Sequence, residues 1–243
     1  MYSTSVSSSE NAPSTSSILF IAVVKTKGAF QRDPLYNNLQ KRQVDISATI
    51  TYLLSKEEIQ EMTAPQINKI LKEQFTFDNF KWQQDNKICI KEPFRADYLN
   101  RVLYKCPHCL TEGKMLGKGI TLSCQACGKS YELDEYGFLQ AEDRLFSHIP
   151  DWYNWERECV RKEIEEQTYR LQIPVDISMM VNTKCIYQIG EGELIHTIDG
   201  FHLKSADGKL DYYQSAKTSY SLYADYFWYE LGDMICVGDQ NVL

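Results

Sequence analysis

The sequence predicts an α+β protein in which helices and antiparallel strands occupy successive segments of the chain. Three observations lead to this class: helix-start signals near residues 55–66, two cysteine pairs within 106–127, and strand-like alternation with recurring turn signals after residue 172. The chain has 243 residues, of which 43% are hydrophobic, so it can bury a sizeable core. We expect, in order, a strand–helix segment, a zinc ribbon, a tryptophan-rich helix and an antiparallel β-rich domain.

The first part of the chain contains two predicted strands. Residues 1–17 are dominated by serine and threonine and are expected to be disordered. The segment 18–102 opens with the apolar residues 18–24, which predict a buried strand, and the β-branched stretch 44–54 predicts a second.

Two capping boxes then predict a pair of helices. Ser55 and Glu58 form the first box, and Thr63 and Gln66 form the second, with Pro65 suited to an early helical position. The expected apolar stripe of the second helix is Ile67, Ile70, Leu71 and Phe75. Four aromatic residues are interpreted as core anchors rather than a ligand cage: Phe75, Phe77, Phe80 and Trp82.

The middle of the chain carries the clearest chemical signal, the cysteine pairs Cys106/Cys109 and Cys124/Cys127. Two residues separate the cysteines of each pair, so that one tight turn can direct both thiolates at one ion, and 14 residues separate the pairs. We expect a zinc ribbon over 103–145, with a hairpin turn at Gly117-Lys118-Gly119 and a further strand from Lys129 to Leu133. Redox-active pairs are the less favoured alternative.

The predicted zinc ion is structural, because four sulfur ligands leave no open coordination position. His108 could replace one cysteine, but the four cysteines suffice. Lysines at 105, 114, 118 and 129, together with backbone amides, could moderate the negative charge of the centre. The other cysteines are expected to be buried, small apolar residues in a reducing compartment, which favours the cytoplasm: Cys89, Cys159, Cys185 and Cys236.

The segment 146–171 predicts the best helix of the chain, from Asp151 to Gln167, with Asp151 as its cap. Its expected apolar face is Trp152, Trp155, Cys159 and Ile164, and Glu158 is placed to pair with Lys162. From 172 to 243 the pattern changes to short strands, which predict an antiparallel β domain. Its cluster of bulky aromatic residues, Tyr220, Tyr223 and 226–229, is interpreted as packing rather than a ligand groove.

Net charge limits the partners of the chain. The total is −7, and 172–243 alone contributes −6, so we expect no nucleic-acid partner. A small basic group near the start is either a solvated face or a contact for an anionic lipid or phosphate surface: Lys25, Lys27, Arg32, Lys41 and Arg42. No apolar run is long enough to predict a transmembrane helix.

No catalytic residue is predicted. The string from His202 to Asp207 has the His-x-x-x-x-Asp spacing of acyltransferases, in which the histidine acts as general base. Here it runs from a predicted strand into a turn of an acidic region, and we interpret it as a chance match.

Four longer strings carry a resemblance: FTFDNFKWQ, FRADYLNRVLYKCPHC, HIPDWYNWERECVRKEI and SLYADYFWYE. They resemble the C-terminal region of clostridial lysophospholipid (1-acyl-glycerol-3-phosphate) acyltransferases, in which a zinc ribbon and a β-rich tail follow the catalytic domain. The resemblance covers roughly 21–243. It implies that 18–102 is the C-terminal remnant of an acyltransferase domain.

The same resemblance implies that the chain is inactive alone. The family's His-x-x-x-x-Asp block and its acceptor-phosphate block would both precede residue 21, where only the serine-rich stretch stands, and His202 does not occupy the family position. We therefore expect an accessory region, or fragment, of a phospholipid-synthesis acyltransferase that contacts lysophospholipid or the inner membrane face peripherally. The alternative is a zinc-ribbon module that binds protein or lipid without catalysis.

Overall fold

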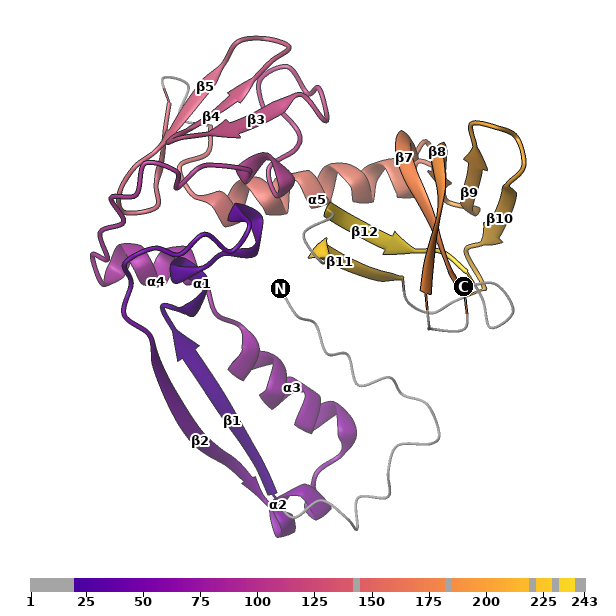
Figure 1. The fold of residues 1–243 in the computed structure, drawn as a ribbon. Helices are drawn as coiled ribbons and strands as arrows, with labels where there is room; N and C mark the ends of the chain where they lie inside the picture. Colours follow the sequence, from indigo (N-terminus) through magenta and orange to yellow (C-terminus); the bar gives the residue numbers. More distant parts are fainter. Residues whose placement is uncertain (1–19, 142–144, 182–184, 219–221, 229–231, 239–243) are drawn as a thin grey trace.

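The computed structural model describes residues 20–141, 145–181, 185–218, 222–228 and 232–238 (Figure 1). It confirms the α+β class: the sheets are antiparallel, a four-cysteine cluster lies between β-hairpins, and a tryptophan-containing helix precedes a β-rich C-terminal part. The predicted disorder of 1–17 and the aromatic residues Tyr220 and Tyr229 lie outside the described residues. The domain boundaries stay a prediction.

The chain begins with a long two-stranded ribbon, β1 (Phe20–Lys27) and β2 (Ser47–Ser55). It is followed by α2 (Lys56–Glu61) and α3 (Ala64–Phe75), and we call these four elements the arm (Figure 1). Both capping boxes are confirmed: the Ser55 amide donates to the Glu58 carboxylate at 2.7 Å, and the Thr63 amide donates to Gln66 Oε1 at 2.8 Å. These side chains satisfy amides that the first helical turn leaves unpaired.

Ile67, Ile70 and Leu71 form a half-buried stripe on α3, as expected, although none of them is fully buried. The expectation that Phe75 and Phe77 are core anchors is wrong, because they are 59% and 43% exposed. The first strand buries Val23 but leaves Val24 exposed. A two-stranded ribbon is too narrow to bury all of the apolar side chains of the helices beside it. Of the predicted aromatic anchors, Phe80 is buried in the main core and Trp82 is half-buried.

The main core lies where the first half of the chain meets the ribbon sheet and the first turns of the long helix. Four short helices border it: α1 (Ala29–Arg32), η2 (Leu35–Asn37), α4 (Asn79–Asp85) and η3 (Leu99–Arg101). Its fully buried side chains include Leu99, Leu103, Leu122, Tyr131 and Trp152. The cysteine region therefore shares one core with segments on both sides of it.

The ribbon sheet has four antiparallel strands in sequence order: β3 (Met115–Lys118), β4 (Thr121–Cys124), β5 (Ser130–Leu133) and β6 (Leu139–Gln140). The predicted third strand is present, but the turn lies at 119–120 because Gly117 belongs to β3. A Cβ on Gly117 would lie 2.4 Å from the Ala96 carbonyl oxygen. Glycine therefore lets the sheet pack directly against the 96–99 backbone.

The long helix α5 spans Ile149–Glu165, so it begins two residues before the predicted cap. His148 is the N-cap residue, and Asp151 lies exposed in the first turn. Ile149 is buried in the core, so the helix begins there rather than at Asp151. Pro150 is tolerated as the second helical residue, because the first turn does not need its missing amide. Glu158 pairs with Arg161 at 3.3 Å rather than with Lys162.

The C-terminal part contains a four-stranded sheet in the order β10-β9-β8-β7 and a separate β11–β12 hairpin. The bounds are β7 (Arg170–Val181), β8 (Cys185–Thr197), β9 (Gly200–Ser205), β10 (Asp211–Ser215), β11 (Tyr223–Trp228) and β12 (Gly232–Cys236). An ion pair between Arg101 and Asp233 joins this part to η3. Within the described ranges, no helix is long and apolar enough to cross a membrane.

Candidate metal centre

The four predicted ligands come together in one cluster. The sulfur atoms of Cys106, Cys109, Cys124 and Cys127 all lie within 4.8 Å of one another. The Cys106–Cys127 and Cys109–Cys124 sulfur pairs are each 3.7 Å apart, far beyond the length of a disulfide bond, and all eight cysteines are free. Zinc–sulfur bonds of about 2.3 Å place the corners of a tetrahedron about 3.8 Å apart. The cluster therefore fits a structural zinc site.

The two cysteine turns are geometric repeats of one another. In the first, the Cys106 amide donates to the Thr111 carbonyl at 3.0 Å and the Leu110 amide donates to the Cys106 carbonyl at 2.9 Å. In the second, Cys124 makes the same two bonds with Lys129 and Gly128, at 2.8 and 2.9 Å. The fourth residue after each leading cysteine is left-handed: φ is 62° at Leu110 and 77° at Gly128. One repeated local fold thus delivers both sulfur pairs.

Backbone amides moderate the charge that thiolates would place here. Burial raises the pKa of the Cys106 thiol to about 12, and the amides of Cys109 and His108 oppose that rise. The hydroxyl and amide of Thr111 lower the pKa of Cys109 to about 6. A metal must therefore hold Cys106 as a thiolate, whereas Cys109 loses its proton readily.

Lys105, the residue before Cys106, pairs with carboxylates instead of moderating the charge of the sulfurs as expected. The Lys105 ammonium pairs with Glu112 at 3.0 Å and with Glu163 at 3.3 Å. The pair with Glu163 anchors the first cysteine turn to the far end of α5. His108 is exposed and lies outside the cluster of the four sulfurs.

A clamp from α5 holds the residue before Cys106, and sequence reasoning missed it. The Lys105 amide donates to Glu156 Oε1 at 2.8 Å, and the Lys105 carbonyl accepts from Trp152 Nε1 at 3.0 Å. Trp152 and Glu156 lie four residues apart, on one face of the helix. Both are 0% exposed. The available signal was a carboxylate one turn beyond a tryptophan on the apolar side of the helix.

The buried carboxyl of Glu156 is incompletely satisfied. Its Oε2 atom is buried without a hydrogen-bond partner in the part of the chain that the structure describes. Burial raises the pKa of Glu156 to about 8, against the opposing effect of the Lys105 and Tyr104 amides. The Glu156 side chain is therefore mostly protonated at neutral pH. It accepts the hydrogen bond of the Lys105 amide as a neutral acid.

Among the described residues, neither the remaining cysteines nor the His202–Asp207 string belongs to a cluster of metal-ligating side chains. Cys89 and Cys159 are half-buried and Cys185 is exposed, so the expectation that all are buried is wrong. His202 lies on β9 and contacts Asp211 at 2.5 Å, whereas Asp207 binds the Ser205 hydroxyl in the following turn. The histidine and the aspartate of the His202–Asp207 string therefore have different partners in the structure.

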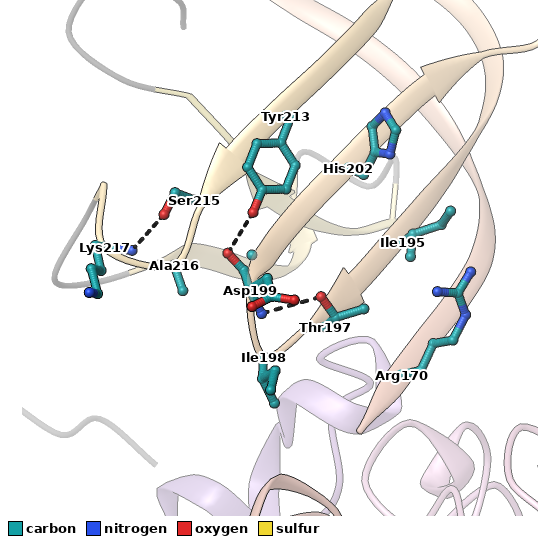
Figure 2. A pocket seen from close by; sticks show the side chains of 11 residues that line it. Arg170, Ile195, Thr197, Ile198, Asp199, His202, Tyr213, Ser215, Ala216 and Lys217 are labelled. Carbon is teal, nitrogen blue, oxygen red and sulfur yellow. Dashed lines mark hydrogen bonds between the residues drawn. The ribbon is translucent and has the colours of Figure 1, made fainter. Parts of the chain in front are cut away.

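A groove of about 670 Å³ lies on the outer face of the β7–β10 sheet (Figure 2). It is lined by the side chains of Arg170, His202 and Lys217, but Arg170 donates to Gln172 and His202 is engaged by Asp211. The Tyr213 hydroxyl donates to the Asp199 carbonyl across its floor. These three side chains are exposed or already paired, so the groove lacks the buried polar groups that orient a ligand.

Comparison with known proteins leaves the metal cluster as the main guide to function. No family model matches the chain, and neither the curated proteins nor the solved structures include a match. The zinc-ribbon part of the resemblance noted above is supported by the four-cysteine cluster, and no family match supports the acyltransferase part.

Proposed function

We propose that the chain is a noncatalytic binding module built around one structural zinc ion held by Cys106, Cys109, Cys124 and Cys127. The observation that carries this proposal is the agreement between the 3.7 Å sulfur spacing and the geometry of tetrahedral zinc. Four sulfur ligands leave no position for water or substrate, so the ion would stabilise the fold and take no part in a reaction.

Metal analysis of protein purified without chelator tests the zinc centre. We expect about one zinc per chain, because four thiolates complete the coordination of one ion. Cys109→Ser should lose at least about tenfold in zinc affinity, whereas Cys159→Ser, which lies outside the cluster, should keep it. Chelation should increase hydrogen exchange over 103–139. A wild-type chain without metal, or equal affinity in both variants, would disprove the centre.

A cobalt-exchanged sample tests the donor set directly. Tetrahedral thiolate coordination should give intense thiolate-to-cobalt charge-transfer absorption, and Cys109→Ser should weaken it. His108→Ala should leave the spectrum unchanged, since His108 lies outside the cluster. A spectrum that changes with His108 instead would show that the donor set is wrong.

The acyltransferase relationship is a second proposal, and one observation favours it. The β1–β2 ribbon has only two strands and leaves one face apolar and exposed, as a piece of a larger sheet would. As an accessory region, the chain should transfer no acyl group from a thioester donor to a lysophospholipid. Turnover that His202→Ala abolishes would contradict both this proposal and our interpretation of the His202 string.

A further inference from the structure

One face of the β1–β2 ribbon is uncharged and open to solvent. Alternation along the strands places Phe20, Ala22, Val24 and Thr26 on this face. The last three lie opposite Tyr52, Ile50 and Ala48 of the second strand. Phe20 and Tyr52 stack with ring centroids 5.7 Å apart, which confirms that both strands contribute to it. We call these seven residues the open face.

The open face is exposed, whereas the opposite face is covered where α2 contacts the two strands (Figure 1). By strand alternation Val23 and Leu54 point to that opposite face, and they are only 4% exposed. On the open face Ile50 is 74% exposed, Val24 60%, Tyr52 59% and Phe20 54%. Among the described residues, none covers these side chains.

A lipid surface fits the open face poorly. Peripheral membrane elements combine an apolar face with lysine or arginine at its rim, but the open face has no charged residue, and Lys25 and Lys27 alternate onto the other side. In the part of the chain that the structure describes, the ribbon also has two unpaired edges, whose amide and carbonyl groups would lose water on insertion into hydrocarbon. A protein surface leaves such edges in contact with water.

A second copy of the same face fits well. An uncharged face meets its own copy without like-charge repulsion, which matters for a chain of net charge −7. At roughly 150–250 Å² per large side chain, the exposed fractions correspond to about 450 Å² per copy. Two copies, with the adjoining alanine and threonine residues, reach the roughly 1,000 Å² that a specific interface needs.

We propose that the chain forms a symmetric dimer through the open face, with the two ribbons packed as the layers of a small β-sandwich. Sheets pack face to face at about 10 Å. In this dimer the apolar side chains of the two open faces would form the contact. The symmetry places Ile50 and Val24 of each copy against the same patch of the other. The dimer does not depend on the zinc centre.

Sedimentation velocity of the full chain, measured up to about 100 µM, tests the dimer. Ile50→Lys should weaken dimerisation at least about 100-fold, because each dimer would bury the added charge twice. Thr49→Lys is the matched control: it adds the same charge to an exposed neighbour on the other side of the strand and should change the dimer constant less than about threefold. Circular dichroism and zinc content, measured on the same samples, show that each variant folds and separate this result from the zinc test.

Two results would overturn the proposal. A wild-type chain that stays monomeric over the whole concentration range has no such interface, and a dimer that tolerates Ile50→Lys uses another surface. Flotation with phosphatidylcholine and phosphatidylglycerol vesicles adds the lipid alternative. A monomer that floats with vesicles, and loses this binding in Ile50→Lys, would assign the open face to lipid instead.

Discussion

Replacement of Glu156 by glutamine should stabilise the protein, by an amount that grows with pH. The ordinary pKa of this carboxyl is 4.5, and burial raises it to about 8 in the folded protein. Between these two values the folded state keeps a proton that the unfolded state has released, so the free energy of unfolding falls as pH rises. Below pH 4.5 both states are protonated and the effect disappears.

The structure sets the size of this effect. At about 1.4 kcal/mol per pH unit, the wild-type chain should lose about 5 kcal/mol between the two pKa values, and about 3 kcal/mol of that by neutral pH. Glutamine keeps the acceptor for the Lys105 amide and cannot ionise. Glu156→Gln should therefore nearly match the wild type near pH 5 and exceed it by roughly 3–5 kcal/mol at pH 7–8.

The neighbouring charges do not change the sign of this prediction. Glu112 acts in the same direction as burial, because its charge also disfavours ionised Glu156. The Lys105 ammonium is already engaged by Glu112 and Glu163, which limits its ability to neutralise a charge on Glu156. The buried Oε2 atom has no described partner to compensate ionisation.

Urea unfolding followed by tryptophan fluorescence, at about pH 5 to 9 and with saturating zinc, measures the effect. Protonation of the zinc ligands at low pH affects both proteins alike, so the difference between wild type and variant isolates Glu156. Glu158→Gln, an exposed change on the same helix, is the control and should show a flat difference. A difference for Glu156→Gln that is equally flat would refute a buried acid with a raised pKa.

Three further substitutions test local geometry by the same unfolding assay. Gly117→Ala should lose roughly 2–4 kcal/mol, because its Cβ would clash with the rigid Ala96 carbonyl, and full stability would refute that packing. Leu110→Gly should gain up to about 1 kcal/mol by relieving a left-handed leucine in the first cysteine turn; a marked loss would contradict this. Ser55→Ala should cost about 1 kcal/mol by removing the cap of α2, and no change would show that the capping box contributes little.

The metal cluster could be predicted from the sequence because its geometry is local. Each C-x-x-C turn fixes the relative position of its own two sulfurs, and the intervening hairpin is short enough to bring the turns together. The capping boxes were predictable for the same reason, since Ser55 and Glu58 are three residues apart. In both cases the interacting residues are neighbours in the chain.

The features that the sequence did not reveal depend on contacts between distant residues. Glu156 meets Lys105 across 51 positions. Its place one turn beyond Trp152 indicates the apolar side of the helix, but nothing local indicates its partner. The helix start at Ile149 rather than Asp151 follows from burial of Ile149 in a core that other segments complete. Phe75 and Phe77 were expected inside because they are aromatic, but the ribbon beside them is too narrow to bury them.

The shared core determines how far the zinc ion would act. Cys106 and Cys124 are themselves core residues, packed in the same cluster as Leu99, Leu103 and Trp152. Loss of the ion would leave the sulfurs unsatisfied at the centre of that cluster and would release the Lys105 backbone from its α5 clamp. Chelation should therefore loosen the start of α5 and the 96–103 segment together with the cysteine turns. The arm, whose buried residues Val23, Leu54 and Ile59 lie outside this cluster, should keep its protection against hydrogen exchange.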